Sequence, residues 1–271
     1  MAEKNNFPLP PTENNAAVIA EALRQIQEGN AAEALEALSG VIDRLTAAGG
    51  MPDALLLAEA LRARGTAYFS LRNLHASCRD FTAAVKSDPN NAVGFFDLGV
   101  VTSLLDNGAS TAMKCYNRAL ELDDSLADCY YNRGNLHDSL GEYREAIADF
   151  TRAIELVPEM TAAWNNRGNA RVELADYTGA LADFEEVIRL NPERENAYTN
   201  RGYVREVLGD TEGALADYNR TLEKSPNDLT ALANRTRLLS DMRRAETQDA
   251  ETQGTEEPAE EENDKPSGEN A

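Results

Sequence analysis

The triplet Asn-Arg-Gly occurs three times at a spacing of 34 residues, at positions 132–134, 166–168 and 200–202. An altered copy, Asn-Arg-Thr, follows after another 34 residues at 234–236. A fixed period of this length indicates one supersecondary unit copied along the chain. Since each copy packs mainly on its neighbours, the sequence predicts a stack of units and not a single globular core.

The period extends over a longer stretch when each glycine of the triplet is set as the eighth residue of a unit. Five units then follow one another without a gap between residues 58 and 228. The second unit is one residue longer, and its extra residue falls in the turn at 106–108, where insertions disturb packing least. We predict units at 58–91, 92–126, 127–160, 161–194 and 195–228.

Each unit is predicted to contain two helices, because Ala, Leu and Glu are abundant and β-branched runs are rare. In the unit 127–160 we expect the first helix at about 126–140 and the second at about 143–156, with a turn at 141–142. Pro158 ends the second helix, because proline lacks a backbone N–H and disfavours helix in the residue before it. The predicted fold class is therefore all-α, built from stacked helix-turn-helix pairs.

Small residues recur at one position of each helix. Glycine is the eighth residue of every unit, although glycine inside a helix costs about 1 kcal/mol relative to alanine. Serine or alanine holds the matching place in the second helix, and an aromatic residue follows four positions later. We expect the small residues to let two helix backbones approach, and the aromatic side chains to fill the space between adjacent units. These aromatic residues are Phe81, Tyr116, Phe150, Phe184 and Tyr218.

The period and these glycine, small and aromatic positions together resemble the tetratricopeptide repeat (TPR) family. The resemblance covers residues 58–228. It implies a right-handed α-solenoid whose first helices line a concave groove. It also implies a scaffold for protein–protein interaction rather than an enzyme.

The two ends depart from the repeat pattern. Residues 15–57 are predicted to hold a degenerate helix pair and a connection, and residues 229–245 a capping helix that covers the last apolar face. Residues 1–14 are predicted to be disordered. Residues 246–271 form an acidic tail without large apolar residues, which we also predict to be disordered.

Arginine stands directly before the glycine in four units, where the TPR family usually has leucine. Sixteen residues later, each of these units has aspartate. The unit 92–126 lacks both and has Leu98 and Cys115 instead. We therefore predict a partly buried ion pair with a structural role between the two helices of a unit. The predicted pairs are Arg64–Asp80, Arg133–Asp149, Arg167–Asp183 and Arg201–Asp217.

The asparagines of the triplets are expected to form a row in the groove, together with residues three and four positions away. A carboxamide both donates and accepts hydrogen bonds, so such a row suits an extended peptide backbone. The row resembles the asparagine ladder in the repeat domain of O-GlcNAc transferases, from which Asp97 departs. The alternative is that the asparagines are solvated residues copied with the repeat. The predicted groove residues are Asp97, Tyr131, Asn132, Asn135, Asn165, Asn166, Asn169, Asn200, Tyr203 and Asn234.

Charge restricts the class of partner. The net charge of -21 argues against nucleic acid and against anionic membranes. The carboxylates expected in the groove favour a neutral or basic protein segment. These carboxylates are Asp128, Asp138, Glu173 and Glu206.

A second resemblance concerns TPR domains that bind chaperones by gripping a terminal carboxylate with two asparagines and several basic residues. Asn135 and Asn166 match the asparagine places. The places of the basic residues hold Tyr131, Asn196 and Asn200. The sequence therefore favours another kind of partner, and a co-chaperone adaptor remains an alternative.

Catalytic and cofactor motifs are not found in the sequence. There is no glycine-rich phosphate loop, no zinc spacing and no Ser/His/Asp set, so we expect no metal, no cofactor and no enzymatic activity. The three cysteines have no disulfide spacing, and the sequence has neither a secretory signal nor an apolar run that spans a bilayer. We expect a cytoplasmic protein that binds other proteins. A self-assembling TPR protein, forming homo-oligomers through its end caps or its convex face, is the other alternative.

Overall fold

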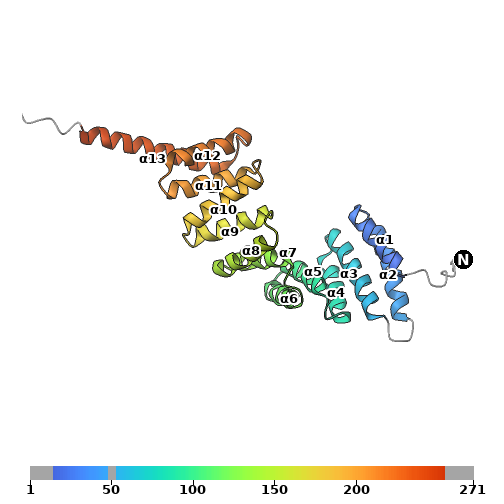
Figure 1. Cartoon of the computed structure of the whole chain (residues 1–271). Helices are drawn as coiled ribbons and strands as arrows, with labels where there is room; N and C mark the ends of the chain where they lie inside the picture. The colour runs from blue at the N-terminus through green and yellow to red at the C-terminus, as the bar shows by residue number, and fades with distance from the viewer. Residues whose placement is uncertain (1–14, 48–52, 254–271) are drawn as a thin grey trace, which may run out of the picture. The chain divides into compact units, whose positions relative to one another are not determined.

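The computed structural model describes residues 15–47 and 53–253, which form thirteen α-helices and no strand (Figure 1). The predicted all-α fold class is confirmed. The chain divides into two compact parts, which we call the N-terminal part, up to Asp176, and the C-terminal part, from Tyr177. Residues 1–14 and 254–271, for which we predicted disorder, lie outside the described residues.

The N-terminal part is a series of helix pairs. Consecutive helices pack on each other, and the first helices of neighbouring pairs also touch, as α5 does with α7 and α7 with α9. On α3, Arg62 bonds to Asp97 of α5, so the first helices α3, α5, α7 and α9 form one continuous face. The helices are α1 (Asn15–Gln27), α2 (Ala31–Ala47), α3 (Ala54–Ser70), α4 (Leu74–Ser87), α5 (Ala92–Ser103), α6 (Ala109–Leu122), α7 (Ala127–Ser139), α8 (Tyr143–Leu156) and α9 (Thr161–Glu173).

The helix α3 begins earlier than the repeat pattern indicated. The predicted unit starts at residue 58, whereas α3 starts at Ala54. Asp53 caps this helix, since its Oδ1 accepts a hydrogen bond from the backbone N–H of Leu56 at 3.1 Å. An aspartate before an apolar run is a helix-start signal, and the residue was available in the sequence.

The C-terminal part consists of α10 (Tyr177–Leu190), α11 (Glu195–Val207), α12 (Thr211–Lys224) and α13 (Leu229–Gln253). The helix α13 packs on both α11 and α12. It continues eight residues past the predicted end at 245, so residues 246–253, which we placed in the disordered tail, are helical. The physical reason is that no glycine or proline stops the helix before Gly254.

In four of the helix pairs, the glycine of the first helix lies directly against the aromatic residue of the second helix. A Cβ atom on Gly134 would lie 2.7 Å from the Phe150 ring, and one on Gly99 would lie 2.6 Å from Tyr116. The same contact occurs at Gly65 and Gly202. The aromatic side chains thus fill the space between the two helices of one pair, which we had not predicted. Packing between units comes in addition, because Phe81 clusters with Leu98 and Val101 of the next pair.

Candidate binding face

Three of the four arginine–aspartate pairs are bidentate ion pairs between the two helices of a unit. Arg133 donates from Nε and Nη2 to the two carboxylate oxygens of Asp149, at 2.7 and 2.6 Å. Arg64–Asp80 and Arg201–Asp217 have the same geometry. The hydrogen bonds to Asp149 hold the pKa of Arg133 above its ordinary value, although burial opposes this. Arg167 and Asp183 lie in different parts of the chain, so their pairing stays a prediction.

The arginines also bond to the preceding unit, which the sequence reasoning missed. Arg133 Nη1 donates to Asn117 Oδ1 at 2.7 Å, and Arg167 Nη1 donates to Thr151 Oγ1 at 3.0 Å. Both acceptors stand sixteen residues before their arginine, so the spacing in the sequence could have revealed them. These residues hold the scaffold together and are not candidates for binding a ligand.

Four of the predicted groove residues meet between α7 and α9 in what we call the amide cluster. Asn166 Nδ2 donates to Asn135 Oδ1 at 2.8 Å and to the Tyr131 hydroxyl at 3.3 Å. Asn165 Nδ2 donates to Asn166 Oδ1 at 3.1 Å. Asn165 was predicted to face the groove, but it is buried with only 4% of its surface exposed, and its side chain supports Asn166 through this bond.

Asn132 does not join this cluster. Its Nδ2 donates at 2.8 Å to the backbone carbonyl of Asp128, one turn earlier on the same helix. The triplet asparagines therefore do not make the same contacts along the row. Asn166 uses both amide hydrogens within the protein, whereas Asn132 keeps its carbonyl oxygen and one N–H available.

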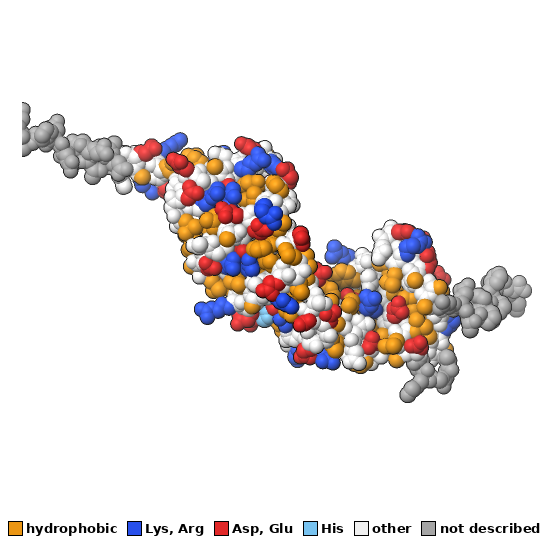
Figure 2. Space-filling view, in the orientation of Figure 1, with side chains coloured by type: hydrophobic (Ala, Val, Ile, Leu, Met, Phe, Trp, Pro, Cys, Tyr) orange, Lys and Arg blue, Asp and Glu red, His pale blue; other side chains and the backbone are white. Residues whose placement is uncertain are grey.

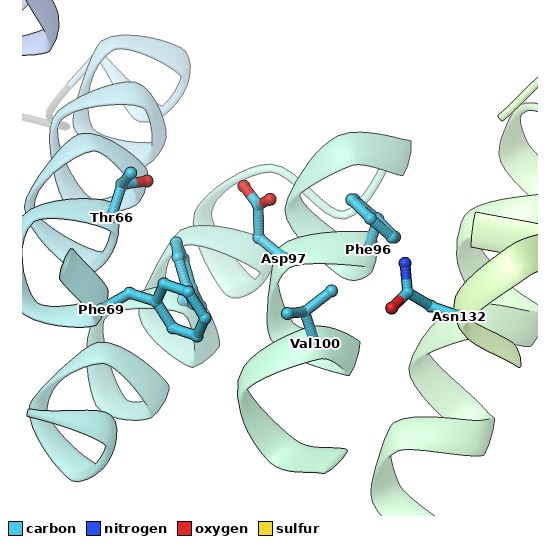
Figure 3. Close-up of a pocket in the computed structure, with 7 residues that line it drawn as sticks. Thr66, Phe69, Phe96, Asp97, Val100 and Asn132 are labelled. Atoms are coloured by element: carbon cyan, nitrogen blue, oxygen red, sulfur yellow. The ribbon is translucent and has the colours of Figure 1, made fainter. Parts of the chain in front are cut away.

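A hollow of about 250 Å³ opens where α3, α5 and α7 meet (Figure 3). Its walls are mainly apolar, and Figure 3 shows side chains from all three helices around it. The Asp97 Oδ2 atom accepts a hydrogen bond from Arg62 Nη1 at 3.3 Å. The lining residues are Thr66, Phe69, Phe81, Phe96, Asp97, Val100 and Asn132. Of these only Asp97 and Asn132 belong to the predicted groove residues.

The hollow exists because two hydrogen-bond acceptors are missing there. In the next pair, Asn166 is held by the Tyr131 hydroxyl and the Asn135 carbonyl. The equivalent positions one unit earlier are Phe96 and Val100, which have no polar side-chain atom. The Phe96 ring lies beside Tyr116 as Tyr131 lies beside Phe150, with ring centroids 6.3 and 6.0 Å apart. With nothing to accept its amide hydrogens there, Asn132 bonds to its own helix.

Carboxylates add negative charge to the same face. Burial raises the pKa of Asp97 above its ordinary value, and the charge of Arg62 opposes the rise. Burial also raises the pKa of Asp138 on α7, and the nearby carboxylate of Glu173 on α9 adds to the effect. Two like charges held close together favour a cation between them.

The raised pKa of Asp138 leads to a prediction about pH. The folded state binds this proton more tightly than the unfolded state, whose carboxyl pKa is about 3.9. The resulting stability is therefore fully present below that value and is lost as the pH rises through the folded-state pKa. We expect Asp138→Asn to raise the melting temperature at pH 7 and to leave it unchanged near pH 3, as measured by calorimetry.

The control for this substitution is Asp128→Asn, on the same helix but exposed to solvent. We expect no rise in its melting temperature at either pH. A melting temperature of Asp138→Asn at or below that of the wild type at pH 7 would contradict the interpretation.

Of the four remaining predicted groove residues, Asn169 is exposed on α9, and the other three lie in the C-terminal part. Tyr203 is 39% exposed, and Asn200 and Asn234 are half-buried. Glu206 is already engaged, because it accepts hydrogen bonds from Arg237 at 2.5 and 3.0 Å and from the Tyr218 hydroxyl at 3.0 Å. Acidic and basic side chains are mixed on the visible surface of this part (Figure 2). Exposed pairs such as Arg220–Glu223 belong to that surface and contribute little to stability.

Within 15–47 and 53–253, no three His, Cys, Asp or Glu residues are grouped so that they could hold a metal ion. Across the same ranges, no helix combines the length and the apolar character that crossing a bilayer requires.

Comparisons with known proteins agree with the repeat architecture. Two models described as tetratricopeptide repeat match residues 127–160 and 165–228. A sequence search of the curated proteins found no match. Among solved structures, PilF of Pseudomonas aeruginosa superposes with a TM-score of 0.69 at 14% identity, covering 82% of this chain and 97% of that chain.

Two further structures are similar in fold. YrrB, described as a TPR protein with an unusual peptide-binding site, gives a TM-score of 0.64 at 20% identity, over 74% of this chain and 99% of that chain. MamA superposes with a TM-score of 0.57 at 23% identity, and the match covers 60% of this chain and 94% of that chain. At these identities the similarity establishes the fold alone. The two repeat matches show that the chain contains tetratricopeptide repeats, at residues 127–160 and 165–228.

Proposed function

We propose that this protein is a non-enzymatic scaffold that binds an extended segment of another protein on the face of α3, α5, α7 and α9. The observation that supports the proposal is that two asparagines on α7 each keep a side-chain polar group without a hydrogen-bond partner in the described part of the chain. The Oδ1 atom of Asn132 and the Nδ2 group of Asn135 have no hydrogen-bond partner among the described residues. They are three positions apart, so both lie on the same side of the helix.

An unpaired acceptor beside an unpaired donor matches what a peptide backbone offers. Each residue of an extended segment carries one N–H and one C=O, and a carboxamide can bond to either. The Asn135 side chain is already held by Asn166, so little conformational freedom is lost when a segment binds. Recognition through the backbone places few demands on the partner's sequence.

The charge of the face supports a neutral or basic segment. Asp138 and Glu173 interact as like charges between α7 and α9, and a lysine or arginine of the partner would relieve their repulsion. YrrB, which shares the fold, is described as having a peptide-binding site. We also propose that Asn169 on α9, and Asn200, Tyr203 and Asn234 in the C-terminal part, contact a bound segment.

The arrangement favours backbone binding over a clamp for a terminal carboxylate. Asn135 and Asn166, the two asparagines that match such a clamp, are bonded to each other. The group beside them is the Tyr131 hydroxyl and not a cation. We therefore expect a chaperone C-terminal peptide with acidic residues to bind at least tenfold more weakly than a basic peptide of equal length.

Binding can be tested with peptides selected from a randomised twelve-residue phage library on the full chain. We expect the double substitution Asn132→Ala with Asn135→Ala to weaken binding of a selected peptide at least tenfold, measured by fluorescence anisotropy. The matched control replaces Asn90 and Asn227, which are exposed in loops, by alanine and should leave the affinity unchanged. If the folded double variant binds as tightly as the wild type, the face is not the binding site.

A further inference from the structure

We infer that the hollow at α3, α5 and α7 is an anchor pocket for one large apolar side chain of the bound segment, with a lysine or arginine a few residues away in that segment. This inference rests on the proposed function and adds a sequence requirement to it. The inference rests on two neighbouring features of one face. An apolar hollow lies next to Asn132, and the carboxylates of Asp138 and Glu173 lie one helix further along.

The chain contains its own comparison for this pocket. The same place between α7 and α9 is closed, because Tyr131 and Asn135 hold Asn166 across it. Between α5 and α7, Phe96 and Val100 replace these two residues and no side chain closes the gap. The pocket is thus a local departure from the repeat and not a general property of the stack.

The size and lining of the pocket define its occupant. A dry apolar cavity of about 150 Å³ is large enough to bind benzene. The hollow has about 250 Å³, and Phe69, Phe96 and Val100 give it apolar walls. Removal of apolar surface from water drives such a contact. The carboxylate in the wall, that of Asp97, is engaged with Arg62 and leaves the pocket suited to an apolar group.

Charge complementarity determines the residues next to the anchor. Packed helices are about 8–10 Å apart, and an extended chain advances about 3.3 Å per residue. A segment anchored at α5 therefore reaches Asp138 and Glu173, between α7 and α9, after about three or four residues. Asp138 is half-buried on α7 and Glu173 is exposed on α9, and because these two helices touch, a basic side chain of the segment fits beside both carboxylates. The expected partner motif is a large apolar residue with lysine or arginine three or four positions to one side.

The experiment selects peptides from a randomised twelve-residue phage library on the full-length wild type and on three variants. Val100→Asn introduces a carboxamide where the next pair has Asn135 and should close the hollow by bonding to Asn132. Thr66→Leu fills the hollow from the opposite wall without introducing a polar group. Val93→Asn is the matched control, because Val93 lies on the same helix but is 41% exposed, outside the hollow.

We expect wild type and Val93→Asn to select one fixed large apolar residue with a basic residue three or four positions away. Val100→Asn and Thr66→Leu should bind those peptides at least tenfold more weakly. The pocket inference is wrong if the selected peptides show no preference for an apolar residue, or if both filled variants bind them as tightly as the wild type. The proposed function still stands in that case, provided that Asn132→Ala with Asn135→Ala weakens peptide binding. If no peptide is enriched on any form of the chain, the proposed function itself fails, and the pocket inference with it.

Discussion

Asp149→Ala should lower the free energy of unfolding by about 2–3 kcal/mol. The Asp149 side chain is 7% exposed and that of Arg133 is 20% exposed, so the substitution leaves an arginine without its carboxylate at a largely buried site. Losing one partner of a buried ion pair costs about 3–5 kcal/mol, and the remaining solvent exposure of Arg133 reduces this figure. Hydrogen exchange of α7 and α8 measures the local loss, because repeat arrays can unfold in sections.

The unit 92–126 provides the matched control for this substitution. It has Leu98 and Cys115 at the positions of Arg133 and Asp149, and both are buried at 7% exposure. We therefore expect Arg133→Leu together with Asp149→Cys to cost less than the sum of the two single substitutions, by about 1–3 kcal/mol. Additive single effects would mean that the two side chains do not stabilise each other.

Gly134→Ala should destabilise the fold by about 1–2 kcal/mol, although alanine is the better helix former. The new methyl group would lie 2.7 Å from the ring of Phe150, which is fully buried and cannot move aside. Overpacking costs about 1–3 kcal/mol, which exceeds the gain of about 1 kcal/mol in helix propensity. Urea denaturation followed by circular dichroism measures the difference.

Gly40→Ala is the control with the opposite expected sign. Gly40 lies inside α2, and the nearest side-chain atom to its added Cβ would be Arg44 Nη1 at 3.5 Å. Without a steric cost, the gain in helix propensity remains, and stability should rise by about 0.5–1 kcal/mol. If both substitutions change stability in the same direction, close packing is not what retains glycine at position 134.

The fold was predictable because one spacing recurs along most of the chain. The ion pairs were predictable for a related reason: Arg133 and its aspartate are replaced together by Leu98 and Cys115 elsewhere in the same chain. The predicted end of α13 at residue 245 was wrong. The acidic composition suggested a disordered tail from residue 246, but no glycine or proline stops the helix before Gly254.

The contacts within the binding face were less predictable. A row of asparagines in sequence does not reveal which carboxamides bond to one another. The bonding depends on the neighbouring side chains. Asn166 donates a hydrogen bond to Asn135 on the neighbouring helix, whereas Asn132 donates to a backbone carbonyl of its own helix. The hollow follows from the absence of two polar atoms, at Phe96 and Val100, and such an absence becomes visible only once the helices are packed.

The central claim is that Asn132 and Asn135 on α7 bind the backbone of an extended segment. NMR of the side-chain amide groups, recorded while a selected peptide is added to the full chain, tests it most directly. We predict that the amide resonances of Asn132 and Asn135 shift and exchange more slowly with solvent, while that of Asn90 stays unchanged. Saturated binding of the peptide with both α7 resonances unmoved would contradict the claim.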